Sequence, residues 1–94
     1  MINSSTPWNL LAHARVEKKL RRLNDKDRRL IRAQLDKLRQ DPFTCKIQPL
    51  KNQTTGWRLE VGNWRLPLDI YPDKLLVYVA DVLRRSTTTY RKRR

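Results

Sequence analysis

The spacing of apolar residues predicts two helices in the N-terminal half of the chain. Val16, Leu20 and Leu23 recur at intervals of four and three residues, the pattern of one apolar helix face over residues 13–23. A second stripe, over residues 25–39, consists of Leu30, Ile31, Leu35 and Leu38. Arginine and lysine occupy many of the other positions, so we expect a helical hairpin with one apolar and one basic side.

Polar residues mark the ends of these helices. Asn24 has the character of an N-cap, and Asp27, three residues on, can complete a capping box. Asp41-Pro42 ends the second helix, because the residue before proline disfavours helical backbone. Residues 8–12 form either a short strand or the approach to the first helix. Residues 41–56 are a connecting segment from which Ile47 and Leu50 are expected to reach the core.

The pattern changes to strict alternation after residue 56, which predicts strands. Gly62-Asn63 is a two-residue hairpin signal. That turn places Glu60 opposite Arg65 and gives Arg58, Glu60 and Arg65 one common face of the sheet. The apolar residues, including Trp57 and Trp64, then share the opposite face and are expected in the core.

The last predicted strand, residues 75–82, is almost wholly apolar, as in a central strand covered on both faces. Pro67 cannot donate to a ladder, so it implies an edge, a bulge or a kink. We therefore predict an α+β fold: an N-terminal helical hairpin packed on one face of a small, mainly antiparallel sheet of three to four strands. One domain spans residues 1–94, with a loose lead-in (1–7) and a basic tail (91–94).

Charge adds the strongest global signal. Lysine and arginine number 22 against 9 acidic residues, giving a formal charge of +13. Such a field attracts polyanions, either nucleic acid or an acidic protein. The single cysteine, Cys45, excludes an intrachain disulfide, and with one histidine, His13, a metal site is not expected. We expect no cofactor, no signal peptide and no membrane span, and hence a cytoplasmic protein.

Candidate chemistry is concentrated between residues 57 and 90. The residues concerned are Arg58, Glu60, Arg65, Arg84, Arg85 and Tyr90. Arginines bind phosphate in bidentate fashion but remain charged, so they cannot move protons. Cleavage of RNA would then need Glu60 as general base and Tyr90 as a proton donor or stacking group. Equally, Glu60 could be only an ion-pair partner of Arg65, and neighbouring arginines weaken a carboxylate as a base.

The chain resembles the RelE/ParE toxin superfamily of bacterial toxin–antitoxin systems over roughly residues 8–90. The resemblance is carried by A-R-V-E-K-K-L-R-R-L, D-K-L-R-Q-D-P, P-L-K, G-W-R-L-E-V-G-N-W-R-L, D-K-L-L-V-Y-V-A-D-V and R-R-S-T-T-T-Y, in that order. It implies a microbial RNase-like fold and a cognate antitoxin. It also implies metal-independent, ribosome-dependent mRNA cleavage in the RelE branch, with mRNA and ribosomal RNA of the A site as partners.

The resemblance also implies roles for individual residues. It matches Arg58, Arg65, Arg85 and Tyr90 to family site residues and Lys51 to a basic residue after the P-L pair. Arg84 and Arg91 are added as RNA-binding candidates. Glu60 departs from the family pattern, where RelE has a lysine, which leaves the general base open. Two rivals remain: a ParE-like DNA gyrase poison, and a non-catalytic basic RNA-binding module or inactive toxin.

Overall fold

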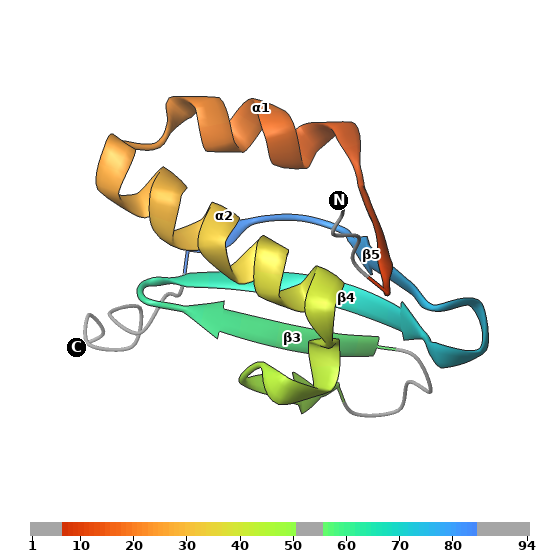
Figure 1. The fold of residues 1–94 in the computed structure, drawn as a ribbon. Coiled ribbons are helices and arrows are strands. Elements are labelled where there is room, and N and C mark those ends of the chain that lie inside the picture. The colour runs from red at the N-terminus through yellow and green to blue at the C-terminus, as the bar shows by residue number, and fades with distance from the viewer. Residues whose placement is uncertain (1–6, 51–55, 85–94) are drawn as a thin grey trace, which may run out of the picture.

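The computed structural model describes residues 7–50 and 56–84, in which a layer of helices covers one face of a sheet (Figure 1). The helices are α1 (Ala14–Arg22) and α2 (Asp25–Gln40), with single 3-10 turns η1 (Pro42–Thr44) and η2 (Pro72–Lys74). The strands are β1 (Asn9–Ala12), β2 (Ile47–Pro49), β3 (Gly56–Val61), β4 (Trp64–Tyr71), β5 (Leu76–Val79) and β6 (Leu83–Arg84). The order is β1-β5-β4-β3-β2, and β6 pairs with β4. The predicted α+β class is confirmed.

The helical hairpin begins and ends where its capping residues predict. His13 caps α1, and its Nδ1 accepts the backbone N–H of Arg15 at 3.1 Å, so the histidine has a structural role. Asn24 caps α2 by accepting the backbone N–H of Asp27 at 2.8 Å. The chain leaves α2 at Asp41, directly before a proline, as expected.

The β3–β4 hairpin has the predicted register. Glu60 pairs with Arg65 across the two-residue turn, in which Gly62 has a φ of +57°. β1 runs parallel to β5, which shows that the segment before α1 is a strand. Residues 7–50 and 56–84 contain six strands, more than the expected three to four, because the short segments β1, β2 and β6 add to three longer strands.

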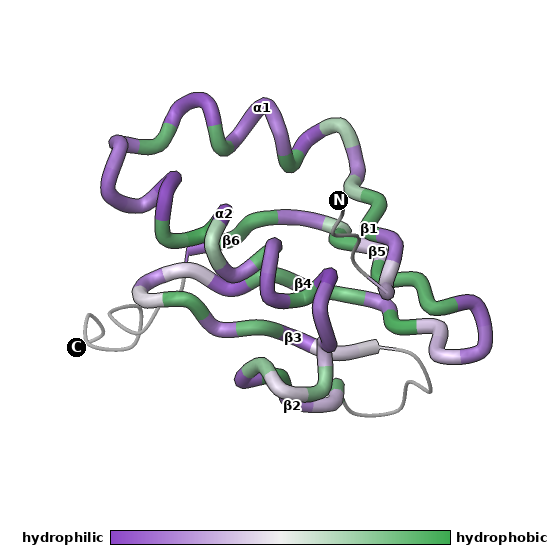
Figure 2. The backbone as a smooth tube through the Cα atoms, in the orientation of Figure 1, coloured by the Kyte–Doolittle hydropathy of each residue, from purple (hydrophilic) through white to green (hydrophobic). Residues whose placement is uncertain are grey.

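Alternation along the strands and the apolar faces of the helices build one core between the two layers. The hydrophobic stretches of α1 turn toward the sheet and its hydrophilic stretches turn away (Figure 2). The buried apolar side chains are Trp8, Val16, Leu20, Ile31, Leu35, Leu38, Leu59, Val61, Trp64, Leu66, Leu68, Ile70, Val77, Val79 and Val82. No helix in the described ranges has the length and apolar character needed to cross a membrane.

Three expectations about the core need correction. Leu30 was placed in the apolar stripe of the second helix, but 40% of it is exposed at the hairpin turn of the sheet. Trp57 is only partly buried and packs at the core's edge. β5 is not covered on both faces, because Leu76 and Tyr78 remain partly exposed while Val77 and Val79 are buried. The helices cover only one face, so the second face is left open.

Candidate functional site

The three charged residues predicted to share a sheet face do converge there. Glu60 Oε2 lies 3.4 Å from Arg58 Nε and 3.6 Å from Arg65 Nη2. The three side chains alternate with the buried Leu59, Val61, Trp64 and Leu66, so they stand on the sheet face away from the helices, called here the open face. This Arg58–Glu60–Arg65 cluster carries two positive charges and one negative charge.

Neighbouring strands hold the cluster in place. Gln48 of β2 pairs with Arg58, and its Oε1 accepts a hydrogen bond from Arg58 Nη2. Arg58 Nε and Arg65 Nε are buried and make no hydrogen bond within the described residues, although Arg58 Nε is ion-paired with Glu60. The sheet and these partners orient the guanidiniums, while 32% of the Arg58 side chain and 43% of the Arg65 side chain stay exposed. Guanidinium groups arranged in this way are suited to bidentate contact with a phosphate.

Arg84 does not join this cluster. Its Cζ lies 4.5 Å from the ring centroid of Trp64, a cation–π contact on the side of the sheet that faces the helices. There it lines an apolar hollow together with Lys19, Arg22 and Leu23 of the helical hairpin. Arg84 lies on this side because it pairs with the inward-facing Trp64, and its role in RNA binding stays a prediction.

Four other site candidates, Lys51, Arg85, Tyr90 and Arg91, lie outside the described residues. Their roles remain predictions from sequence. Among residues 7–50 and 56–84, no group of three or more histidine, cysteine or acidic side chains could hold a metal ion.

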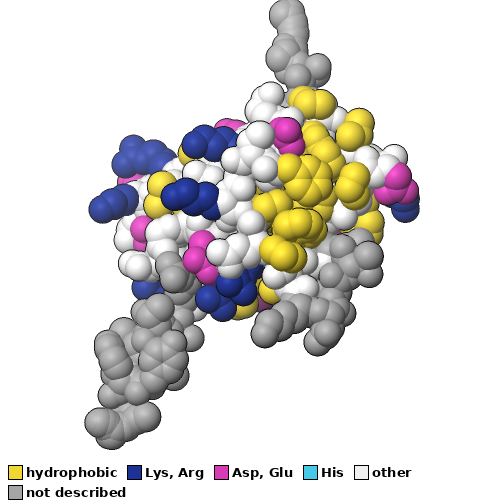
Figure 3. All heavy atoms as spheres, turned by 90° about the horizontal axis from the view of Figure 1, so that it is seen from below, with side chains coloured by type: hydrophobic (Ala, Val, Ile, Leu, Met, Phe, Trp, Pro, Cys, Tyr) yellow, Lys and Arg dark blue, Asp and Glu magenta, His cyan; other side chains and the backbone are white. Residues whose placement is uncertain are grey.

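The open face has a second half that was missed from the sequence. Hydrophobic side chains gather over one part of it, and basic and acidic side chains lie over another (Figure 3). Tyr71 of β4 and Leu76 and Tyr78 of β5 belong to this second half, where they line a hollow of about 470 Å³ with Asp69 and Lys74. The signal was available, since tyrosine interrupts the apolar run at the position that alternation assigns to the open face.

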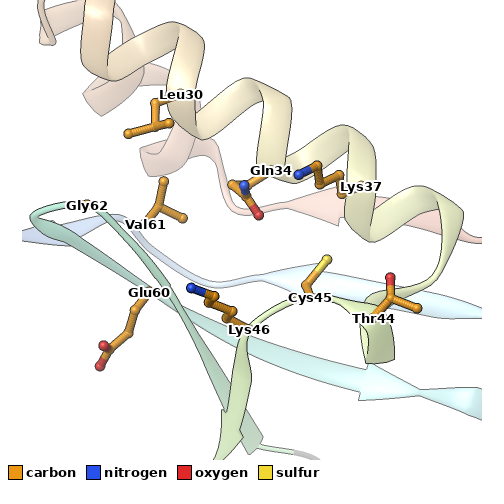
Figure 4. A pocket seen from close by; sticks show the side chains of 9 residues that line it. All are labelled: Leu30, Gln34, Lys37, Thr44, Cys45, Lys46, Glu60, Val61 and Gly62. Atoms are coloured by element: carbon orange, nitrogen blue, oxygen red, sulfur yellow. The ribbon is translucent and has the colours of Figure 1, made fainter.

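A separate cavity of about 430 Å³ lies between α2 and the β2–β3 edge. Its lining includes Gln34, Lys37, Cys45 and Lys46, while the Glu60 carboxylate points away from α2 (Figure 4). Burial raises the pKa of the Cys45 thiol, and the charge of Lys37 only partly opposes this. A thiol whose pKa is raised in this way is not an activated nucleophile.

An ion pair ties the hairpin to the end of the sheet. Asp81 Oδ1 accepts hydrogen bonds from Lys19 Nζ at 2.7 Å and from the backbone N–H of Val82 at 2.8 Å. Burial acts to raise the pKa of Asp81, but these hydrogen bonds and the charges of Lys19 and Arg15 outweigh it. The pKa is therefore below its usual value. Asp81 acts as a structural carboxylate between α1 and the sheet.

Comparison with known proteins finds likeness in structure. No protein-family model and no curated protein matches the sequence. The archaeal RelE of a RelE–RelB complex from Pyrococcus horikoshii OT3 superposes with a TM-score of 0.76 at 16% identity, over 86% of this chain and 98% of that chain. The isolated E. coli RelE toxin superposes with a TM-score of 0.69 at 20% sequence identity, and the match covers 89% of this chain and 93% of that toxin.

A chain of the RelB–RelE antitoxin–toxin complex from Methanococcus jannaschii superposes with a TM-score of 0.65 at 17% sequence identity. The match covers 87% of this chain and 98% of that chain. The three proteins come from distant organisms, and nearly the whole of each is matched. The elements described above therefore have the order and arrangement found in RelE toxins. This chain has the RelE toxin fold.

Proposed function

We propose that this chain is the toxin of a toxin–antitoxin pair and acts in the cytoplasm as an endoribonuclease that cleaves mRNA on the ribosome. The observation that carries the proposal is the convergence of Arg58 and Arg65 on Glu60 in the open face of a RelE-like fold. The formal charge of +13 supports a polyanionic substrate and contact with ribosomal RNA.

The proposed reaction uses the chain's own side chains. A general base removes the proton of a ribose 2′-hydroxyl, and the oxygen attacks the adjacent phosphorus. The bond to the 5′-oxygen then breaks, which leaves a 2′,3′-cyclic phosphate, and the departing oxygen takes a proton. Arg58 and Arg65 would stabilise the charge on the phosphorane-like transition state. Glu60 is the proposed base, and Tyr90 is the proposed donor on sequence grounds.

Ribosome dependence follows from the weakness of this acid–base set. The Glu60 carboxylate lies within 3.6 Å of the guanidiniums of Arg58 and Arg65, so it is engaged in ion pairs when the 2′-hydroxyl has to be reached. Arginine cannot replace it as a base, because it stays protonated. A ribosome that holds the message in a reactive geometry would supply what the side chains lack, since alignment of reacting atoms lowers the barrier strongly.

A cognate antitoxin is the proposed protein partner. Two of the similar structures are RelE–RelB complexes, in which the toxin is bound by its antitoxin. The excess of 22 basic over 9 acidic residues predicts that the binding segment of such a partner is acidic or amphipathic. Co-expression of a small acidic neighbour of the gene should relieve growth arrest and co-purify with the chain.

The test is translation of a defined message with purified ribosomes, followed by mapping of message 5′ ends. We expect new ends within the translated region, and we expect none when ribosomes are left out. Arg65→Ala should abolish them, because a guanidinium at the reacting phosphate is lost. Arg29→Ala, which removes the same charge from an exposed position of α2, is the matched control and should cleave normally.

Two outcomes would refute the proposal in different ways. Intact message together with breaks in DNA would point to a gyrase poison of the ParE type. Intact message with salt-sensitive RNA binding and no growth arrest would indicate a non-catalytic RNA-binding module. Arg65→Lys separates the chemistry further, since lysine keeps the charge but loses bidentate contact, and should cleave poorly.

A further inference from the structure

The outward-facing side chains of the open face form a grid whose register can be followed strand by strand. One cross-strand row contains Arg58 of β3 and Pro67 of β4, and ends at Ala80, whose N–H donates to Pro67 O at 2.9 Å. The next row contains Asp69 of β4 and Tyr78 of β5 and ends at Leu11 of β1, which is 56% exposed. A third row pairs Tyr71 with Leu76.

This grid fixes the separation between the arginines and the aromatic residues. Tyr78 lies two strands from Arg58 across the sheet and one side-chain repeat along it. With strands about 4.8 Å apart and same-face side chains about 6.8 Å apart along a strand, the two Cα atoms are about 12 Å apart. A long arginine side chain and one nucleotide of an extended strand can bridge that distance.

We propose that the second half of the open face is a nucleobase-stacking subsite, in which Tyr78 stacks with a base of the RNA strand that the arginines hold by its phosphate. Tyr71, which Lys74 Nζ contacts at 5.9 Å from the ring centroid, forms the rim of the same hollow. The inference rests on the proposed function and adds an element that positions the strand.

The chemistry of the hollow favours a base of single-stranded RNA over an apolar peptide. It combines two phenol rings, one ammonium and one carboxylate, and it adjoins the guanidinium cluster on the same sheet face. Proteins that bind single strands combine a basic track for the backbone with aromatic rings for successive bases. An aliphatic peptide could pack on Leu76 and the rings but has no polar groups for the ammonium and carboxylate of the hollow, whereas a base has both a π face and polar edges.

The test measures binding without cleavage. Short 2′-deoxy oligonucleotides, which lack the attacking hydroxyl, are titrated by fluorescence anisotropy, each with one abasic position. For the wild-type chain we expect one abasic position to weaken binding by about 5- to 150-fold, the range for loss of one stacked base. Tyr78→Ala should weaken binding to the intact oligonucleotide by a similar factor. In this variant, removing the base at the sensitive position should no longer weaken binding. Tyr78→Phe should behave as wild type.

The abasic series on the wild-type chain needs no variant, so it holds even if Tyr78→Ala fails to fold. The inference is overturned if no abasic position matters, or if the sensitive position stays equally sensitive in Tyr78→Ala. It is also overturned if Tyr78→Ala binds the oligonucleotide normally but loses a purified antitoxin, because the patch would then be a protein-docking surface. Arg58→Ala tests the proposed function separately from the stacking subsite. It should reduce the dependence of binding affinity on salt concentration, because a phosphate contact is lost, whereas Tyr78→Ala should leave that dependence unchanged.

Discussion

Replacing Glu60 by glutamine separates its two possible roles, because they predict opposite effects. As an ion-pair partner, Glu60 competes with RNA phosphate for Arg58 and Arg65, so its neutralisation frees both guanidiniums. As a general base, it is required for cleavage. Glu60→Gln keeps the size of the side chain and removes one negative charge placed 3.4 and 3.6 Å from two cationic nitrogens.

The size of the binding effect follows from Coulomb's law. A phosphate on the far side of a guanidinium lies about 8 Å from the carboxylate, because two contact distances near 3 Å add to the roughly 2 Å between guanidinium nitrogens. Their repulsion is about 2 kcal/mol at an effective dielectric of 20 and about 0.5 kcal/mol in water. Because 26% of the Glu60 side chain and 43% of Arg65 are exposed, the lower range applies. We expect about fivefold tighter binding, corresponding to about 1 kcal/mol.

Cleavage should change in the opposite direction. Loss of a general base costs about 10²- to 10⁴-fold in rate. The assay pairs anisotropy on an uncleavable oligonucleotide with single-turnover cleavage of message on ribosomes. The chain offers a matched control in Glu17→Gln on α1, since Glu17 Oε2 also contacts two arginines, at 3.0 and 3.8 Å. Undiminished cleavage by Glu60→Gln would show that Glu60 is not the base.

Substitutions at three further residues test the interpretation of the fold around the site. Arg84→Ala should lower stability by about 0.5–1 kcal/mol through its contact with Trp64, with cleavage retained; loss of cleavage with stability intact would return Arg84 to the site. Asp81→Asn should cost about 1 kcal/mol at neutral pH, since its partner lysine is partly exposed. Because the pKa of Asp81 is lowered in the fold, this contribution is present above about pH 4 and disappears as pH falls through the folded pKa. Urea titrations of both chains should therefore converge in acid, and a constant difference would contradict this. Gly62→Ala should cost about 1–2 kcal/mol in thermal melts at its positive φ, whereas Gly62→Asn should be milder.

Short sequence patterns were sufficient to predict features that depend on residues close together in the chain, such as a helix cap or a hairpin register. Asn24 caps α2 because its side chain and the backbone N–H of Asp27 are close in sequence. The Gly62 turn fixes the β3–β4 register, and alternation then brings Arg58, Glu60 and Arg65 together. The open side of β5 was missed because Tyr78 is its one polar mark within Leu76–Val79, in a run otherwise typical of a strand covered on both faces.

The face of the sheet on which Arg84 lies depends on an irregularity in the strand pairing between β4 and residues 80–84, which the sequence does not show. Ala80 N–H donates to Pro67 O, but proline has no N–H to return the bond, so the β4–β5 ladder is interrupted there. Pairing resumes with Leu83 opposite Arg65. From Pro67 to Arg65 β4 advances by two residues, while the opposite segment advances by three residues, from Ala80 to Leu83. This difference of one residue is the signature of a β-bulge.

The extra residue reverses the alternation between the two ends of that segment. Val77 and Val79 are buried, and the next buried position is Val82, an odd number of residues later. Asp81 accommodates the irregularity because its carboxylate accepts the N–H of Val82 and the ammonium of Lys19. If the alternation of Val77 and Val79 continued without a break, Arg84 would lie on the open face. The alternation restarts at the buried Val82, so Arg84 lies on the same side as Val82 and contacts Trp64. The proline noted in the sequence therefore marks the break in the ladder, and the one-residue shift beyond it puts Arg84 on the helix side of the sheet, against Trp64.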